Sequence, residues 1–349
     1  MRLLGIPEYV FDVSRVAALD LPWERLRAKT IVLTGATGLV GSFLVDVLRN
    51  ADIGCKVFLL GRSEEKARAR FAEYWGSSLL RFAKWDAAAP TPPAVDCPAD
   101  FVLHLASNTH PVAYATDPIG TIAMNVIALN GLLSFAVERG SKRFLLASSN
   151  EIYGENRGDV ELFDEKYCGY IDCNTLRAGY PESKRCGEAL CQAYIRQEGL
   201  DCVIARLTRT YGPTVLPTDT KAISQFFSHA LMGEDVVLKS DGMQCFSYQY
   251  VADSVAGLLT VLLKGTCGEA YNIADESGDV TLRDLARLIA GQAGRKVVFD
   301  RPDAVEAAGF SKATKARLDG RKLRLLGWSP AYDIARGVKV NFDILRKMR

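Results

Sequence analysis

Histidine is scarce in this chain, and no two cysteines have the spacing of a metal site. The 349 residues include three histidines and nine cysteines, and no pair of cysteines forms a CxxC motif. Zinc sites are built mostly from clustered cysteine and histidine ligands, so we expect no metal. The cysteines are expected to be small apolar core residues of a protein in the reducing cytoplasm.

A strong charge of either sign and a long apolar run are also missing. The formal net charge is +2, which gives no reason to expect nucleic acid or an anionic membrane as a partner. The apolar stretch Val255–Gly265 is far shorter than a membrane span. The N-terminus meets charge and proline too early for a signal peptide. We therefore expect a globular protein of one large domain or two lobes.

Short apolar runs alternate with longer amphipathic ones from Thr30 onward. This alternation predicts a parallel sheet covered by helices on both faces, which is a Rossmann-type, doubly wound α/β domain. The predicted strands are 30–35, 56–61, 78–86, 100–107, 144–149 and 202–207, and the predicted helices are 39–50, 63–75, 119–140 and 180–199.

The rhythm loosens after Tyr211, where a loop rich in proline and threonine begins. We assign 29–210 to a dinucleotide-binding domain and 211–349 mainly to a smaller, mixed α/β C-terminal lobe for the substrate. Residues 244–264 are expected to return to the first domain. Residues 1–28 form an N-terminal extension in which "LDLPWERL", 19–26, suggests the start of a helix packed on the surface.

A glycine-rich turn follows the first predicted strand and opens the first helix. Its sequence "TGATGLVG" holds Gly35, Gly38 and Gly41 three residues apart. Glycines there allow a tight turn, and backbone N–H groups can approach a pyrophosphate at the helix N-terminus. The turn therefore predicts dinucleotide binding, with contacts from these glycines and from Thr37, Leu39 and Val40.

The choice between NAD and NADP depends on the ends of the next strands. An acidic residue after the second strand would bind the ribose 2′-hydroxyl of NAD, but Arg62 stands there and is compatible with either cofactor. Asp86, after the third strand, is a candidate for the adenine amino group. We favour NAD without excluding NADP.

Polar residues gather where the strand "FLLASS" ends, and a tyrosine and a lysine follow on a helix. Tyr180 and Lys184 are spaced i, i+4, so they share one helix face. An ammonium one turn away, with a positive nicotinamide, would lower the phenol pKa toward neutral pH. Ser149 would hold the reacting oxygen while Tyr180 takes its proton and a hydride leaves for the nicotinamide.

With these residues in view, the chain resembles an extended short-chain dehydrogenase/reductase of the sugar-nucleotide epimerase/dehydratase group. The resemblance runs from about Lys29 to Trp328. Within the group, the chain is most similar to UDP-glucuronate decarboxylases. The resemblance implies tightly bound NAD, a nucleotide sugar oxidised at C4, cofactor contacts at Leu105, Ala106, Ser107 and Asn125, and a homodimer through the helices 119–140 and 180–199. The motifs that carry it are "TGATGLVG", "HLAS", "NV" at Asn125, "SSNEIYG", "YPESK", "RLTRTYGP" and "LGWSP".

The resemblance also gives a use to the two residues after Ser149. Relatives that dehydrate or decarboxylate carry a glutamate at the place of Glu151, where it can abstract a C5 proton or orient a leaving carboxylate. Asn150 cannot deliver a proton, which counts against simple dehydration. The alternatives are a 4-epimerase, which does not need Glu151, and a non-catalytic NAD(P)-binding sensor, which would not need Tyr180.

Two positions in the expected substrate pocket depart from the pattern of the resembled family. Arg209 stands where an asparagine is usual, and Phe246 stands where an arginine is usual. We expect Arg209 to take over the charge of the missing arginine. Tyr114 and Arg177 are further expected substrate contacts.

Overall fold

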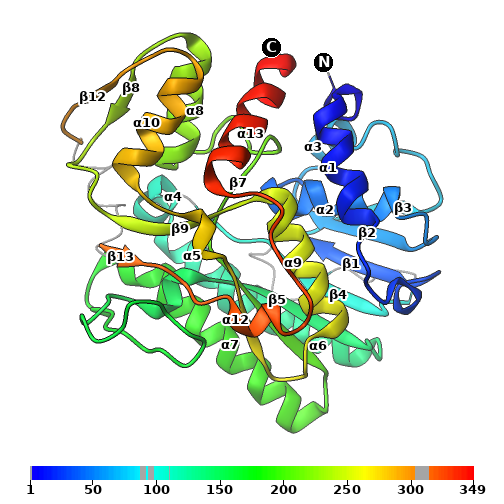
Figure 1. Ribbon diagram of the computed structural model, residues 1–349. Coiled ribbons are helices and arrows are strands. Elements are labelled where there is room, and N and C mark those ends of the chain that lie inside the picture. The colour runs from blue at the N-terminus through cyan, green and yellow to red at the C-terminus, as the bar shows by residue number, and fades with distance from the viewer. Residues whose placement is uncertain (1, 87–91, 93–97, 110, 303–313) are drawn as a thin grey trace.

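The computed structural model describes residues 2–86, 92, 98–109, 111–302 and 314–349. A parallel sheet of seven strands lies at its centre, in the order β10-β6-β5-β4-β1-β2-β3 (Figure 1). This confirms the doubly wound α/β prediction. The strands are β1 Thr30–Thr34, β2 Lys56–Gly61, β3 Leu80–Lys84, β4 Phe101–His104, β5 Arg143–Ser149, β6 Cys202–Leu207 and β10 Ala270–Ile273.

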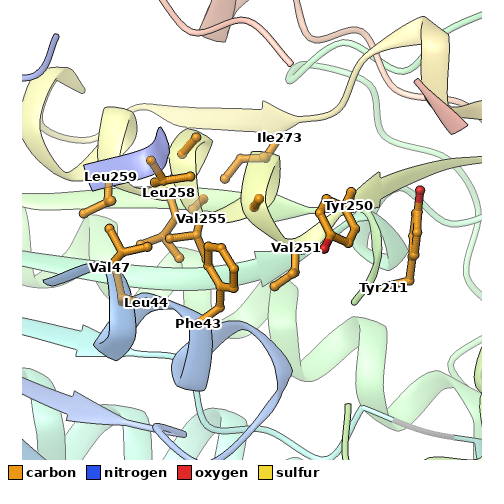
Figure 2. Close-up of a cluster of buried hydrophobic side chains, with 14 of the residues drawn as sticks. Phe43, Leu44, Val47, Tyr211, Tyr250, Val251, Val255, Leu258, Leu259 and Ile273 are labelled. Atoms are coloured by element: carbon orange, nitrogen blue, oxygen red, sulfur yellow. The ribbon is translucent and has the colours of Figure 1, made fainter. Parts of the chain in front are cut away.

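Helices cover both faces of this sheet and bury its strands on both sides. In β1, Ile31 and Leu33 join one hydrophobic cluster, whereas Val32 joins the other. Figure 2 shows the first cluster, in which Phe43 of one helix meets Val255 of another. That face is covered by α2 Leu39–Asn50, α3 Glu64–Arg70 and α9 Val251–Lys264, and the other by α6 Leu129–Glu138 and α7 Gly179–Glu198.

The helix predicted over 119–140 is continuous but not regular. It comprises α5 Pro118–Ala123, a π-helical segment Met124–Ala128 and α6, and the short α4 Pro111–Thr116 precedes it. By length and composition alone, Pro118–Glu138 could span a bilayer, but half of its apolar window is buried in the protein, as in the core helix of a soluble protein. The sequence prediction had considered only the shorter stretch at 255–265.

The smaller lobe is built around one strand, β9 Cys245–Tyr250. β7 Arg209–Tyr211 and β13 Lys315–Ala316 pair with it in parallel, and β11 Asp279–Thr281 pairs antiparallel. A separate parallel pair joins β8 Val236–Leu238 to β12 Val297–Phe299. The helices of this part of the chain are α8 Ala222–Met232, α10 Leu282–Gln292, α12 Arg321–Arg324 and α13 Ile334–Met348.

The division between the lobes differs from the predicted one in two places. Within 244–264, α9 packs on the large sheet, but β9 belongs to the smaller sheet. Beyond it, β10 pairs with β6 and forms the edge of the large sheet. Every residue of α9 from Val251 to Leu263 is buried, so this helix joins the two parts of the core.

The N-terminal extension contains a helix where none was predicted, α1 Pro7–Ala17, while 19–26 holds only a 3₁₀ turn, Trp23–Arg25. α1 is not a surface appendage. Tyr9 is fully buried and donates a 2.5 Å hydrogen bond to Asp46 of α2. Its neighbour in Figure 1 is α13, and an ion pair between Glu8 and Lys347 joins the two ends of the chain.

The prediction that the cysteines are core residues is correct for only some of them. Cys55, Cys191 and Cys202 are buried, and Cys245 is half-buried. Cys97 lies outside the described residues. The other cysteines are exposed because they lie in loops or on the outer side of α7, namely Cys168, Cys173, Cys186 and Cys267.

Candidate functional site

The glycine loop between β1 and α2 is packed so closely at Gly35 and Gly41 that neither position can accommodate a side chain. Gly35 has a φ of +72°, and a Cβ there would lie 2.7 Å from the backbone nitrogen of Ala106. A Cβ on Gly41 would lie 2.3 Å from the carbonyl oxygen of Gly35. Gly38 begins α2 with no side-chain cap, so the first N–H groups of the helix remain available to a pyrophosphate. Thr37, Leu39 and Val40 lie in the same turn.

Two buried residues that were not predicted hold the loop after β4 against the glycine loop. His104 Nδ1 and Thr34 Oγ1 are 2.8 Å apart, and Thr34 Oγ1 accepts a 3.2 Å hydrogen bond from the Ala106 backbone. Burial lowers the pKa of His104 to about 3, so the ring stays neutral. The positions of Leu105 and Ala106 next to the glycine loop follow from this arrangement.

Asn125 connects the same loop to the helix of the YxxxK motif. Its Oδ1 accepts a 2.8 Å hydrogen bond from Ser107, and its Nδ2 donates a 3.0 Å hydrogen bond to Ser183. Asn125 lies in the π-helical segment, a distortion that is frequent at functional sites. Ser183, which precedes Lys184, was not predicted.

Arg62 and Asp86 follow β2 and β3, which are adjacent strands on the far side of β1 from β4. Both side chains are exposed. The carboxyl ends of these strands lie at the same edge of the sheet as the glycine loop, where a dinucleotide is expected. Their roles in cofactor selection stay predictions.

The structure brings Ser149, Tyr180 and Lys184 together at the end of β5. Ser149 closes β5 and caps the 3₁₀ turn Asn150–Tyr153, while α7 carries the other two side chains. Ser149 lies beside Tyr180, and its hydroxyl acts to lower the pKa of the phenol. Lys184 Nζ donates a 3.0 Å hydrogen bond to the carbonyl of Ala147 and lies 5.9 Å from the centre of the Tyr180 ring.

The pKa of Tyr180 in the protein alone is set by burial and by the charge of Glu151. Burial and then the charge of Glu151 raise the pKa of Tyr180 to about 12, although the hydroxyl of Ser149 opposes the shift. Burial lowers the pKa of Lys184 to about 8. The sequence expectation combines Lys184 with the charge of a bound nicotinamide, whereas burial and Glu151 dominate the phenol pKa in the protein alone. The protein by itself holds the phenol protonated.

Glu151 is held in place by an arginine and lies beside a stack of two tyrosines. Its carboxylate forms an ion pair with Arg177. The Arg177 guanidinium lies 4.6 Å from the centre of the Tyr114 ring, and that ring stacks on Tyr180 at 4.7 Å. The predicted substrate residues Tyr114 and Arg177 thus adjoin the predicted base.

Asn150 and Glu151 open into a pocket between the end of β5 and the smaller lobe. Arg209 also lines this pocket, and its guanidinium lies 3.5 Å from the centre of the Phe246 ring. The two positions that depart from the family pattern are therefore in direct contact. Phe246 itself is buried behind Arg209 and is absent from the lining.

Most of the remaining lining was missed by sequence reasoning. It comes from the segment between the 3₁₀ turn at Asn150–Tyr153 and α7, which has little regular structure over 154–175. The signal was the length of that segment, because long irregular loops inside a compact domain are commonly functional. The missed residues are Gly154, Glu155, Tyr170, Ile171, Asp172, Thr175, Ala178, Pro181 and Ala316.

Known proteins share these features over most of the chain. Residues 31–274 match the model of the NAD dependent epimerase/dehydratase family. UDP-glucuronic acid decarboxylase 1 of Xenopus tropicalis is 32% identical over 325 residues, which covers 91% of this chain and 72% of that protein. UDP-glucuronic acid decarboxylase 4 of Arabidopsis thaliana is 31% identical over 315 residues, with 88% and 66% covered.

Solved structures give the same picture. DesIV, a dTDP-glucose 4,6-dehydratase of Streptomyces venezuelae solved with NAD bound, superposes with a TM-score of 0.78 at 26% identity. That comparison covers 91% of this chain and 97% of the other.

Proposed function

Because the chain belongs to the NAD dependent epimerase/dehydratase family, we propose that it modifies a nucleotide-linked sugar through a 4-keto intermediate, as a decarboxylase or dehydratase. The observation that carries this proposal is the position of Glu151. Its carboxylate lines the pocket and acts electrostatically on Tyr180. A reaction confined to C4 has no step for a carboxylate at this point, whereas dehydration needs a base for the C5 proton and decarboxylation needs an acid that delivers a proton to C5.

The residues present fit NAD. The backbone packs too closely at Gly35 and Gly41 for either residue to carry a side chain. The start of α2 has no side-chain cap, so its backbone N–H groups can bind the phosphates of a ligand. When bound, NAD supplies the hydride acceptor for oxidation at C4 and the hydride donor for any return step. Gly35, Gly38 and Gly41 would hold its pyrophosphate, and Lys184 and Asn125 would face its nicotinamide half.

Ser149 and Tyr180, at the end of β5 and on α7, have different roles in the proton transfer. The Ser149 hydroxyl donates a hydrogen bond to the oxygen on C4 of the sugar. Tyr180, as the phenolate, takes the proton of the C4 hydroxyl. The positive charge of the oxidised cofactor opposes the effects of burial and Glu151 on the phenol pKa. Lys184 holds the base of α7 against β5 through its bond to Ala147.

Decarboxylation then requires a sugar whose carboxylate lies β to the new ketone. The C5–C6 bond breaks, its electron pair forms an enolate on the C4 oxygen, carbon dioxide leaves, and a proton is added at C5. Arg177 and Glu151 lie where the reacting sugar would be bound, next to Tyr114 and Tyr180. Relatives of this chain include UDP-glucuronic acid decarboxylases, so UDP-glucuronate is the first substrate to test.

A 4-epimerase is the second candidate. The observation that favours it is the ion pair between Glu151 and Arg177, which gives Glu151 a structural role independent of chemistry at C5. Epimerisation would use Ser149 and Tyr180 alone and would return the hydride to the other face of C4.

The test is to incubate the purified protein with UDP-glucuronate, UDP-glucose, dTDP-glucose and GDP-mannose and to weigh the products. Loss of carbon dioxide supports decarboxylation, loss of water supports dehydration, and an isomer of equal mass supports epimerisation. The nucleotide released by denaturing the purified protein identifies the cofactor, with NAD expected. Failure to turn over any sugar nucleotide, with no affinity for NAD or NADP, contradicts the proposal.

Two further proposals concern the setting of the enzyme. We place it in the cytoplasm, because exposed unpaired thiols such as Cys186 and Cys267 persist in a reducing compartment. We also propose a homodimer through the helical stretch Pro118–Glu138 and α7, since isoleucines of the former are exposed.

A further inference from the structure

Arg209 is a cation of the candidate pocket that no described carboxylate neutralises by direct contact, although Glu151 acts on it across the pocket. Arg209 forms no ion pair with any described residue, and its Nη1 atom is buried without a hydrogen-bond partner. Burial lowers the pKa of Arg209, which means that the charge is held there at a cost in free energy. Arginines buried in this way usually have a carboxylate partner, so the site is incomplete without an anion.

Phe246 takes the place of that partner. The guanidinium carbon lies 3.5 Å from the centre of the ring, which is close contact for a cation over an aromatic face. A ring accepts no hydrogen bond in the plane of the guanidinium, so the N–H donors of Arg209 stay available. A carboxylate at position 246 would have neutralised the charge and occupied the donors.

Arg177 adds a second set of unused donors to the same pocket. One of its nitrogens binds Glu151, but Nε and Nη1 are buried without partners. The pocket lining therefore has two guanidinium groups, and of its three carboxylates only that of Glu151 forms an ion pair with either of them. Glu155 and Asp172 also line the pocket, but Glu155 is exposed at its rim.

We propose that Arg209, held flat on Phe246, binds an oxyanion of the substrate together with the free N–H groups of Arg177. The planar donor pattern of a guanidinium matches both carboxylate and phosphate oxygens. The oxyanion is either a carboxylate on the sugar or an oxygen of the nucleotide diphosphate. The proposal rests on the proposed function for the identity of the substrate as a nucleotide sugar.

The experiment compares Arg209→Gln with the unchanged protein, both loaded with NAD. Calorimetry measures the dissociation constants of UDP, UDP-glucose and UDP-glucuronate. If Arg209 binds the sugar carboxylate, only UDP-glucuronate loses affinity, by about tenfold to a hundredfold as for other charged hydrogen bonds. If it binds the diphosphate, all three ligands lose affinity by a similar factor.

Two variants serve as controls. Arg283 lies in the smaller lobe over Phe299, at 5.5 Å from the ring centre, and is outside the pocket lining. Arg283→Gln should leave all three constants unchanged. Phe246→Leu keeps the charge of Arg209 but removes the aromatic surface under it. This variant should therefore lose less affinity than Arg209→Gln, and it should lose it for the same ligands.

Equal affinities of Arg209→Gln and the unchanged protein for all three ligands would overturn the proposal. The proposed function can fail separately, if the unchanged protein binds none of them. The probes are then inorganic pyrophosphate and free glucuronate, read as a rise in Tm. A rise in the unchanged protein that is lost in Arg209→Gln supports the oxyanion site, and an equal rise in both proteins, or none in either, overturns it.

Discussion

The rings of Tyr114 and Tyr180 are stacked, with their centres 4.7 Å apart and an angle of 28° between their planes. Tyr114 comes from α4 and Tyr180 from α7, so the stack fixes the position of one helix against the other. Arg177 lies over the outer ring and binds Glu151. Tyr180, Arg177 and Glu151 therefore belong to one contiguous cluster of side chains.

Replacing Tyr180 by phenylalanine should abolish turnover while leaving the stack in place. In the proposed mechanism the phenolate takes a proton in the oxidation step, and loss of such a group costs about 10²–10⁴ in rate. The measurement is kcat with the substrate identified by product mass, alongside the dissociation constant of NAD, which should barely change. Tyr114→Phe is the matched comparison, because it removes the neighbouring phenol and keeps the ring. Its loss should be much smaller, and a Tyr180→Phe enzyme with the original rate would exclude the proposed base.

Glu151→Gln separates the two candidate reactions. Glutamine keeps the shape of the side chain and removes the carboxylate that lines the pocket beside Tyr180. In a dehydratase or decarboxylase, C4 oxidation should continue, so nicotinamide absorbance rises on mixing while product formation slows severely. In an epimerase the overall rate should change only modestly. Fast, unimpaired product release by the variant would rule out the role of Glu151 at C5.

Lys184 should make the stability of the protein depend on pH. Burial lowers its pKa from 10.5 to about 8 in the folded state, so the unfolded chain binds more protons between these two values. Folding is therefore penalised below pH 8, and the penalty disappears as the pH rises toward 10.5. The shift corresponds to about 3 kcal/mol.

Lys184→Met removes this group, and chemical denaturation of both proteins tests its effect. The free energy of unfolding of the variant, minus that of the unchanged protein, should fall by about 2–3 kcal/mol between pH 7 and pH 10. The hydrogen bond to Ala147 is lost in the variant at both pH values, so it cancels in the comparison. A difference that does not vary with pH would mean that folding does not lower the pKa of Lys184.

The N-terminal helix should contribute to stability through one buried ion pair. Arg15 donates a 3.0 Å hydrogen bond to Asp253, whose fully buried carboxylate also accepts from the backbone of Ala331 and Tyr332. Arg15→Ala leaves that charge without a counter-ion and should cost about 3 kcal/mol in the free energy of unfolding. Arg68→Ala breaks an exposed pair with Glu64 and should cost under about 1 kcal/mol. Equal losses in the two variants would contradict the structural role of α1.

The parts of the fold that the sequence predicted well are those with strong local signals. The glycine turn at Gly35 and the helix of Tyr180 are set by short-range chemistry, and the structure has both. β10 was missed because four residues carry too little pattern, and its place in the large sheet depends on pairing with β6, far away in the chain. α1 was missed for a related reason, since its buried polar residues find their partners far away in the chain, as Tyr9 does in Asp46 and Asp12 in Tyr250.

The candidate site divides in the same way. Motif spacing predicted Ser149, Tyr180 and Lys184, because the sheet edge and one helix face bring them together. The contact of Arg209 with Phe246 joins β7 to β9; the sequence predicted that Arg209 takes over the charge of the missing arginine, but not that the two side chains touch. The effect of burial and of Glu151 on the pKa of Tyr180 in the protein alone was not predicted, because burial cannot be judged from spacing.

The last prediction concerns the apolar side of the helix Pro118–Glu138. Ile119 is 81% exposed, and Ile122 and Ile127 are about half exposed, although this helix also packs on α7 and the sheet. Exposed isoleucines in a row are typical of a surface that a partner covers. The unchanged protein should therefore be a dimer at micromolar concentration by light scattering, and Ile119→Asp should shift it toward monomer. Leu325→Asp is the control, because Leu325 is 87% exposed elsewhere on the molecule. A monomeric unchanged protein, or equal dissociation by both variants, would show that this face is not the interface.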